Sequence, residues 1–290
     1  MERKKLHQAG PEFSRIITGA WRWNLPVSSV ENLIFSSLDA GITTFDHADI
    51  YGDHQNEETF GNALKRNTSV RNRIELITKC GIKFPSPHRP AAWVKHYDTS
   101  REHILWSVDN SLKTLHSDRI DLLLIHRPDP LLNPNEVAGA FSALRQSGKV
   151  LHFGVSNFTP TQFELLQDYL DFPLVTNQLE ISLTQHQPLF DGSVDVLMKH
   201  RVSPMAWSPL GGGKLVEGRH GQLFAKGPQY AASPVQLSLA WLLKHPSSIF
   251  PVIGTTRPER ITECAKSVDI KLGLQDWFEM LKIVQGKEMP

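Results

Sequence analysis

The sequence predicts an α/β fold, a (β/α)8 barrel of the TIM type formed by one domain that spans residues 1–290. Two observations support this prediction. Eight strand-like runs alternate along the chain with segments of helical periodicity, as expected for a parallel sheet covered by helices. No Gly-, Ser- or Pro-rich linker and no run of like charges divides the chain. An open, doubly wound sheet would give the same alternation, although the eightfold count favours a closed barrel.

The expected strands are short runs of β-branched, aliphatic and aromatic residues. One of them is almost continuously apolar, which is typical of a parallel strand buried on both faces. The eight runs lie at 15–19, 43–46, 74–79, 121–126, 150–156, 174–178, 202–208 and 249–254.

Apolar residues at helical spacing predict helices between most of these strands, at 28–40, 57–65, 100–115, 135–146, 161–169, 187–199 and 233–244. Ser28 and Glu31 have the spacing of a capping box, so we expect the first helix to start there. Gly148 is expected to end another helix in a left-handed conformation. Two longer connections, 81–98 and 211–232, are expected to shape the substrate or cofactor site.

The composition argues against several classes of partner. The net charge is +1, with lysines and arginines scattered, so the chain has no basic patch for nucleic acid or an anionic membrane. The two cysteines, Cys80 and Cys264, are too few for a disulfide framework and suit a reducing compartment. The N-terminus is charged, and no apolar run has the length of a membrane span. We expect a soluble, cytoplasmic protein, of an oligomeric state that the sequence does not specify.

Titratable side chains stand at the ends of three successive strands. Asp46 ends one strand, Lys79 ends the next, and His126 ends the third. Tyr51 follows Asp46 by five positions, in a loop closed by Gly52. Because function in parallel α/β folds collects at the carboxyl ends of the strands, we expect these four side chains to meet in a catalytic site.

These residues lie in the segments FDHADIYG, LITKCG and LLLIHRPD, which resemble the catalytic tetrad motifs of the aldo-keto reductase superfamily. The resemblance covers nearly the whole chain and implies a closed barrel. It also implies an NADPH-dependent oxidoreductase that reduces an aldehyde or ketone to the alcohol. Tyr51 would be the proton donor, and His126 would orient the carbonyl. Lys79, held by Asp46, would lower the pKa of the phenol.

A metal site is a competing interpretation of the same region. Asp46, His47, Asp49, His54 and His126 offer the carboxylate and imidazole ligands that such a site requires. Adjacent residues of a strand point in opposite directions, so Asp46 and His47 cannot easily share one ion, and we expect no metal. His47 departs from the resemblance, because the family commonly has Thr there. Cys80, beside Lys79, could make the activity sensitive to oxidation.

The resemblance places cofactor contacts at the ends of later strands. Ser156, Asn157 and Gln178 would hydrogen-bond the nicotinamide carboxamide, which needs both donors and acceptors. Trp207 would stack on the nicotinamide ring. The loop after it would bring backbone amides close to the pyrophosphate, through Ser208, Leu210, Gly211 and Gly213.

The segment VIGTTRPERITEC resembles the family's adenosine-phosphate segment. Arg260 matches the arginine that grips the ribose 2′-phosphate, which favours NADP(H) over NAD(H). Gly254, Thr255 and Glu263 belong to the same expected cofactor site. Gly254 stands where some members have lysine, and Cys264 stands where asparagine is common.

The substrate is predicted only as a small-molecule carbonyl compound. Trp21 and Trp93, with Trp23 and Phe84 nearby, could wall a substrate pocket or could serve in packing. Two alternative functions stay open. One is the reverse reaction, the oxidation of a sugar or alcohol with NAD(P)+. The other is a nicotinamide-binding regulatory subunit, for which tight binding and very slow turnover would be expected.

Overall fold

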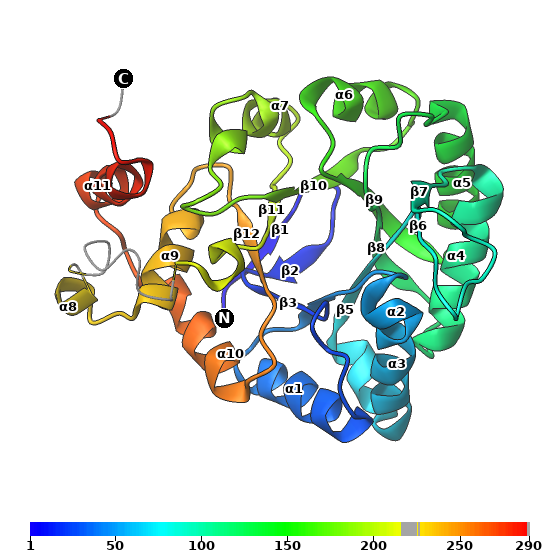
Figure 1. Ribbon diagram of the computed structural model, residues 1–290, viewed down its shortest axis with the longest axis horizontal. Coiled ribbons are helices and arrows are strands. Elements are labelled where there is room, and N and C mark those ends of the chain that lie inside the picture. Colours follow the sequence, from blue (N-terminus) through cyan, green and yellow to red (C-terminus); the bar gives the residue numbers. More distant parts are fainter. Residues whose placement is uncertain (216–224, 226, 289–290) are drawn as a thin grey trace.

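The computed structural model describes residues 1–215, 225 and 227–288. Eight parallel strands close into a barrel in the order β10-β11-β12-β3-β4-β5-β8-β9, and helices surround it (Figure 1). Pairing of Val252 with Ile17, and of Ile253 with Thr18, joins the last barrel strand to the first. The closed barrel confirms the predicted fold class and rules out the open sheet. The barrel strands are β3 (Ile17–Gly19), β4 (Thr44–Asp46), β5 (Glu75–Cys80), β8 (Ile120–Ile125), β9 (Val150–Ser156), β10 (Leu174–Glu180), β11 (Met205–Trp207) and β12 (Phe250–Ile253).

The helices that cover the barrel follow the predicted alternation. They are α1 (Val27–Asp39), α3 (Asn56–Arg66), α4 (Arg101–Thr114), α5 (Pro134–Gln146), α6 (Pro160–Asp168), α7 (Ser193–Lys199), α9 (Pro234–Leu243) and α10 (Pro258–Ala265). The predicted left-handed glycine is confirmed, because Gly148 has a φ of 71°. Short 3-10 turns occupy Thr68–Arg73, Gln187–Leu189, Gly211–Gly213 and Lys266–Asp269.

Two helix boundaries differ from the prediction. The first helix begins at Val27 after Pro26, without a side-chain cap, so the expected cap at Ser28 is wrong. A proline fixes the backbone for a helix start without any hydroxyl. The single helix expected at 187–199 is a 3-10 turn followed by α7, because Gly192 between them has a left-handed φ of 87°. Part of the long connection expected at 211–232 lies outside the described residues.

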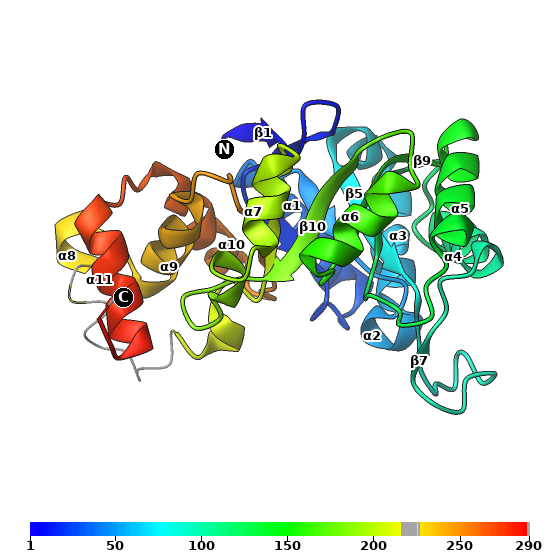
Figure 2. The ribbon, with the colours of Figure 1, turned by 90° about the horizontal axis from the view of Figure 1, so that it is seen from above.

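Several elements were not predicted. A hairpin of β1 (Arg3–Lys5) and β2 (Glu12–Ser14) lies at one end of the barrel, and the β6 (Ile82–Lys83) and β7 (His96–Tyr97) connection extends from the opposite end (Figure 2). The short helix α8 (Gly227–Tyr230) and the C-terminal helix α11 (Leu274–Gln285) lie outside the ring of helices (Figure 1). Trp241 and Trp277 tie α11 to α9, because their rings stack 4.7 Å apart and each indole N–H donates to the other residue's carbonyl.

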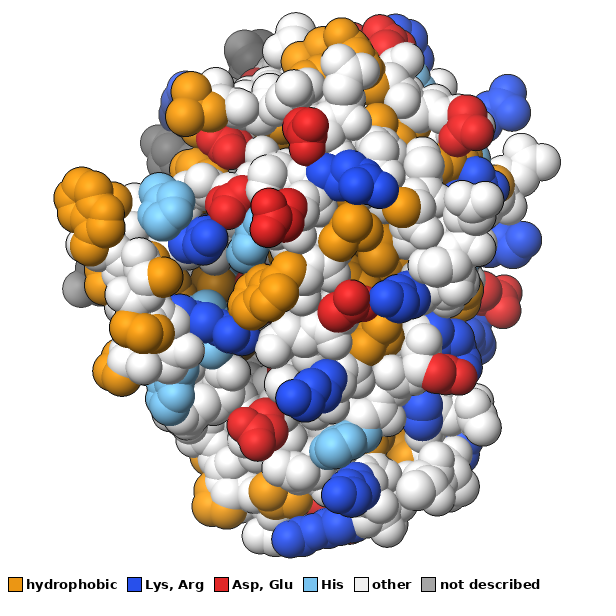
Figure 3. Space-filling model, turned by 90° about the vertical axis from the view of Figure 1, so that its right-hand side faces the viewer, with side chains coloured by type: hydrophobic (Ala, Val, Ile, Leu, Met, Phe, Trp, Pro, Cys, Tyr) orange, Lys and Arg blue, Asp and Glu red, His pale blue; other side chains and the backbone are white. Residues whose placement is uncertain are grey.

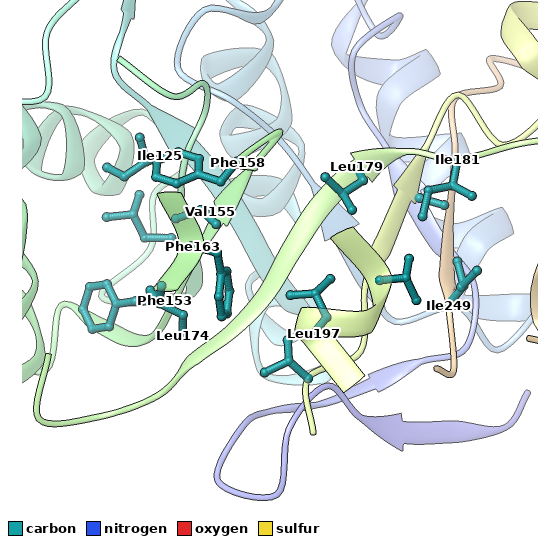
Figure 4. Close-up of a cluster of buried hydrophobic side chains, with 14 of the residues drawn as sticks. Ile125, Phe153, Val155, Phe158, Phe163, Leu174, Leu179, Ile181, Leu197 and Ile249 are labelled. Atoms are coloured by element: carbon teal, nitrogen blue, oxygen red, sulfur yellow. The ribbon is translucent and has the colours of Figure 1, made fainter. Parts of the chain in front are cut away.

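The apolar core lies between the barrel strands and the helices. Figure 4 shows its largest cluster, where side chains of β8, β9 and β10 meet those of α6 and α7. A second cluster, under α1 and α3, contains the rings of Trp23, Phe45 and Phe60 in mutual contact. Burial of such large apolar surfaces is the main favourable term in folding, so these clusters hold the strand ends in place. Among the described residues, no helix is both long and apolar enough to cross a membrane.

Candidate active site

The four predicted catalytic side chains meet at the carboxyl ends of β4, β5 and β8. Asp46 is the last residue of β4, Lys79 is the next-to-last residue of β5, and His126 directly follows β8. Tyr51 begins the short helix α2 (Tyr51–His54) after β4. Since β4, β5 and β8 are neighbours in the barrel, their ends present these groups side by side.

Lys79 is the centre of this group. Its side chain is 1% exposed, and its ammonium donates to both Asp46 carboxylate oxygens at 2.8 and 2.7 Å. It also donates to the His47 carbonyl at 2.8 Å and to the Tyr51 hydroxyl at 3.2 Å. Burial alone would lower the pKa of Lys79, but the charge of Asp46 and the contact with Tyr51 raise it on balance. Lys79 therefore stays charged beside the phenol.

The phenol of Tyr51 faces both Lys79 and His126. The rings of Tyr51 and His126 meet edge to face, with their centroids 5.8 Å apart. Burial raises the pKa of Tyr51, and the charge of Lys79 acts in the opposite direction but does not outweigh it. Lys79 therefore lowers the pKa of Tyr51 as expected, but burial raises it more, so the net shift is upward. Burial, together with the charges of Lys79 and Arg127, lowers the pKa of His126 well below its ordinary value. The site thus holds a protonated phenol beside a neutral imidazole.

A glycine turn places Tyr51 over the barrel end. Gly52 has a φ of 57°, and a Cβ at this position would approach the Asn56 side-chain oxygen to 1.9 Å. The Asn56 amide in turn donates to the Ala20 carbonyl at 2.9 Å, which ties the turn to the end of β3. Position 52 therefore requires glycine, both for the backbone conformation and because a side chain would collide with Asn56.

Polar side chains at the ends of β9 and β10 connect to this group. Gln178 donates through Nε2 to Asp46 at 3.1 Å, and the Ser156 hydroxyl donates to the Gln178 carbonyl at 2.9 Å. The Asn157 amide donates one hydrogen to the Ser156 hydroxyl at 2.8 Å. The Gln178 side-chain oxygen and the second Asn157 amide hydrogen have no partner among the described residues. These unused groups, one acceptor and one donor, fit the hydrogen-bonding needs of a carboxamide.

Trp207 and the loop after β11 lie next to this polar group. The Trp207 indole donates to the Asn157 side-chain oxygen at 2.9 Å, which fixes the plane of the ring. In the loop that follows, the backbone turns through positive φ angles at Ser208, Gly211 and Gly213, of 49°, 59° and 99°. Gly211 has no room for a side chain, because a Cβ would lie 2.4 Å from the Thr184 hydroxyl. Leu210 packs against the cluster under α1 and α3, which anchors this loop.

The connection from β12 to α10 forms the remaining part of the expected cofactor site. A Cβ on Gly254 would meet open space, and the Arg260 side chain has no hydrogen bond or ion pair within the described part of the chain. The Thr255 carbonyl accepts from the Trp23 indole at 3.0 Å, and its hydroxyl accepts from the Arg257 amide. Glu263 accepts from the Ser233 hydroxyl at 2.5 Å. An unpaired arginine beside a helix N-terminus suits a phosphate group.

Comparison with known proteins agrees with this geometry. The model of the Aldo/keto reductase family matches residues 15–285. The chain belongs to this family. It is an aldo-keto reductase family oxidoreductase, and members of the family typically use NAD(P)H.

Relatives of this aldo-keto reductase span its full length. The oxidoreductase YdhF of Escherichia coli (strain K12) is 46% identical over 300 residues, covering 100% of both chains. The 6-dehydroglucose reductase of Agrobacterium fabrum (strain C58) is 44% identical and covers 96% of each chain. A crystal structure of the thermostable aldo-keto reductase Tm1743 with the inhibitor epalrestat has a TM-score of 0.85 and 26% identity, covering 98% of this chain and 100% of that one.

The aromatic residues predicted near the substrate lie in different environments. Trp21 and Trp93 are 61% and 87% exposed. Trp23 is 1% exposed and packs against Phe45 and Phe60, so it is a core residue. Phe84 stacks on the ring of His54 with the centroids 5.0 Å apart. Trp23 is therefore excluded from contact with a bound molecule, whereas Trp21 and Trp93 are exposed enough for it.

The side chains considered as metal ligands do not gather around a common point. Among the described residues, no three His, Cys, Asp or Glu side chains are arranged to hold a metal ion. The His47 ring is buried with its edge against Phe60, 4.4 Å between centroids, and neither ring nitrogen has a partner. Burial, with the charge of Lys79, lowers the pKa of His47 to about 3. His47 is thus a neutral packing residue beneath the site.

Cys80 does not suit the redox role considered from the sequence. It is 1% exposed, at the end of β5. Burial, reinforced by the charges of Asp49 and Glu57, raises its pKa well above the ordinary value. Because the thiolate is the reactive form, a buried and protonated thiol is a poor target for oxidation.

Sequence reasoning considered Asp49 only as a metal ligand and missed that it is buried with Glu57 behind Lys79. Asp49 accepts from the Ser107 hydroxyl of α4 at 2.9 Å, and its other carboxyl oxygen is enclosed without a partner. Glu57 accepts from Thr78 and Ser111 at 2.5 and 2.9 Å. Burial, together with the charge of Glu57, raises the pKa of Asp49 to about 8. The folded protein therefore holds a protonated Asp49 at neutral pH.

This raised pKa predicts a pH-dependent cost in stability. The ordinary pKa of an Asp side chain is 3.8. Between pH 3.8 and about 8, folding therefore takes up a proton, because Asp49 is protonated in the folded protein and ionised in the unfolded chain. The free energy of unfolding consequently falls as the pH rises through this window. Asp49→Asn keeps the shape without the charge. In urea unfolding, the free energy of unfolding of Asp49→Asn relative to that of wild type should increase by at least ~1 kcal/mol as the pH is raised from ~5 to ~8. A difference between the two proteins that does not change with pH would show that Asp49 is ionised in the folded state.

Proposed function

We propose that this protein is an NADPH-dependent carbonyl reductase that converts an aldehyde or ketone to the alcohol. The observation that carries the proposal is the protonated phenol of Tyr51, held 3.2 Å from a buried ammonium beside a neutral imidazole. The cofactor supplies a hydride to the carbonyl carbon when it is bound. The chain must then supply a proton for the oxygen.

The four side chains have separate tasks in this proposal. His126 donates its imidazole N–H to the carbonyl oxygen and so fixes the direction of the C=O bond. Tyr51 transfers its hydroxyl proton to the same oxygen as negative charge develops there. Lys79 stabilises the phenolate that remains, and Asp46 keeps Lys79 charged and in position. Each task uses a side chain that the protein holds in place before any ligand binds.

The unused groups of Gln178 and Asn157 would hold the carboxamide, and Trp207 would support the nicotinamide ring. Amides in the loop of Ser208, Leu210, Gly211 and Gly213 would approach the pyrophosphate. Arg260 would pair with the 2′-phosphate, with Gly254, Thr255 and Glu263 beside it. NADPH is therefore proposed over NADH.

Turnover and binding together test the function. We expect NADPH oxidation with a panel of small aldehydes, ketones and sugar aldehydes, the last included because of the 6-dehydroglucose reductase relative. NADPH should be used in preference to NADH, and Arg260→Gln should reduce that preference. Tight NADPH binding without turnover of any carbonyl would favour a regulatory subunit. Faster turnover of alcohols with NADP+ would favour a dehydrogenase.

A further inference from the structure

Two cations without carboxylate partners lie near the candidate catalytic residues. Arg127 directly follows His126 after β8, and Lys95 lies in the connection between β6 and β7. Neither side chain has a hydrogen bond or ion pair in the part of the chain that the structure describes. In Figure 3, basic, histidine and hydrophobic side chains border a hollow to the left of centre, and acidic side chains lie above it.

Arg127 is restrained although its N–H groups are free. Its guanidinium carbon lies 5.4 Å from the centre of the Trp207 ring, in a cation–π contact. The Trp207 ring is itself fixed by its hydrogen bond to Asn157. Contact with a ring face orients the guanidinium without using its N–H donors, so these remain available to a ligand.

The charge of Arg127 reaches the reacting groups. It lowers the pKa of Tyr51, against the larger effect of burial, and that of His126. Burial makes the largest contribution to the lowered pKa of His126. The remaining contributions come from three cations, Lys79, Arg127 and Lys95. Lys79 is already paired with Asp46. The positive charge of Arg127 therefore remains uncompensated beside the place where a carbonyl would bind.

The 2′-phosphate of the cofactor does not account for this arginine. In the barrel order, β8 lies four strands from β12 in either direction, so Arg127 and the segment proposed for that phosphate are on opposite sides of the barrel. The guanidinium does lie over Trp207, the residue directly before the loop proposed for the pyrophosphate. Binding measured with the cofactor site already filled therefore decides whether a substrate anion uses Arg127.

We propose that Arg127 is a specificity-determining residue that binds an anionic group of the substrate. The substrates are then aldehydes or ketones that also carry a carboxylate, phosphate or sulfonate. This inference rests on the proposed reductase function, which it narrows to a substrate class. A planar guanidinium can form paired hydrogen bonds with each of these groups.

The test compares two aldehydes of nearly the same shape, para-formylbenzoate and its uncharged methyl ester. We expect wild-type kcat/KM to be about ten- to hundredfold higher for the anion, as one charge-assisted contact would give. Arg127→Gln should abolish most of this ratio, chiefly by raising KM for the anion, and Arg127→Lys should retain part of it. Lys113→Gln, a matched control on an exposed lysine at the end of α4, should leave the ratio unchanged. Added salt should lower the wild-type ratio.

Binding provides a readout that does not depend on turnover. Calorimetry on enzyme saturated with NADP+, which has no hydride to give an aldehyde, would compare para-formylbenzoate with its methyl ester, in wild type and Arg127→Gln. Tighter binding of the anion that is lost in the variant supports the inference even if neither aldehyde is reduced, in which case the reductase function alone fails. Equal kcat/KM values and equal binding of the charged and uncharged compounds, or a ratio that Arg127→Gln leaves intact, would overturn it.

Discussion

Replacing Tyr51 with Phe is expected to reduce kcat for carbonyl reduction by about 10²- to 10⁴-fold, the range that a positioned proton donor contributes. The change removes one oxygen atom. Lys79 loses one of its four acceptors and keeps both Asp46 oxygens and the His47 carbonyl. The fold and the cofactor site should therefore persist. Steady-state rates and NADPH binding, measured on the same preparation, check both parts of this expectation.

Tyr169→Phe is a suitable control for the loss of a phenol oxygen, because Tyr169 is 46% exposed at the end of α6. It should leave turnover and NADPH binding at the wild-type level. The raised pKa of Tyr51 adds a pH test, since its proton should remain available up to the ordinary phenol value near pH ~10. A Tyr51→Phe enzyme with wild-type kcat would show that the proton comes from another group.

Replacing Lys79 with Met is expected to have the largest effect on stability. Asp46, whose side chain is 4% exposed, would lose the ammonium that neutralises it and keep only the Gln178 amide. Breaking a buried ion pair from one side costs about 3–5 kcal/mol, because the remaining charge is left without compensation. Turnover should also be lost. Urea unfolding followed by circular dichroism would measure the first effect directly.

The double variant Asp46→Asn with Lys79→Met separates charge from packing. With both charges removed, no uncompensated carboxylate remains, so the double variant should be more stable than Lys79→Met by at least ~1 kcal/mol. It should remain inactive, because the phenolate would have lost the ammonium that contacts its oxygen. A Lys79→Met protein as stable as wild type would contradict the prediction, because it would show that the Asp46 side chain does not need the ammonium of Lys79.

The grouping of the candidate catalytic residues could be predicted because each stands in a local motif at a strand end. Asp46, Lys79 and His126 stand at the ends of short apolar runs. Closure of the barrel brings neighbouring strand ends together, and this does not depend on where the helices begin and end. The loop that ends at Gly52 could be predicted for the same reason, because a glycine after a strand-like run indicates a turn. These signals lie within a few residues of the side chains that they place.

Features that depend on distant contacts could not be predicted. The pKa of Asp49 depends on enclosure beneath α4, whose Ser107 is 58 positions away in the chain. From the sequence, Trp23 could line the substrate pocket or serve in packing. Its packing role depends on burial and on the hydrogen bond from its indole to the carbonyl of Thr255, 232 positions away. The direction of the Tyr51 pKa depends on burial outweighing Lys79, and local sequence gives no measure of burial. The hairpin of β1 and β2 was missed because β1, Arg3–Lys5, is fully polar and exposed, without an apolar pattern.

The transfer of a labelled hydride tests the central claim most directly. Wild-type protein would be given NADPH with both hydrogens on the reactive carbon of the nicotinamide replaced by deuterium, together with an aldehyde that it consumes. The account predicts an alcohol that carries deuterium on the former carbonyl carbon, formed at a rate that Tyr51→Phe reduces by at least ~100-fold. An alcohol without deuterium, or no alcohol despite bound NADPH and aldehyde, would contradict it.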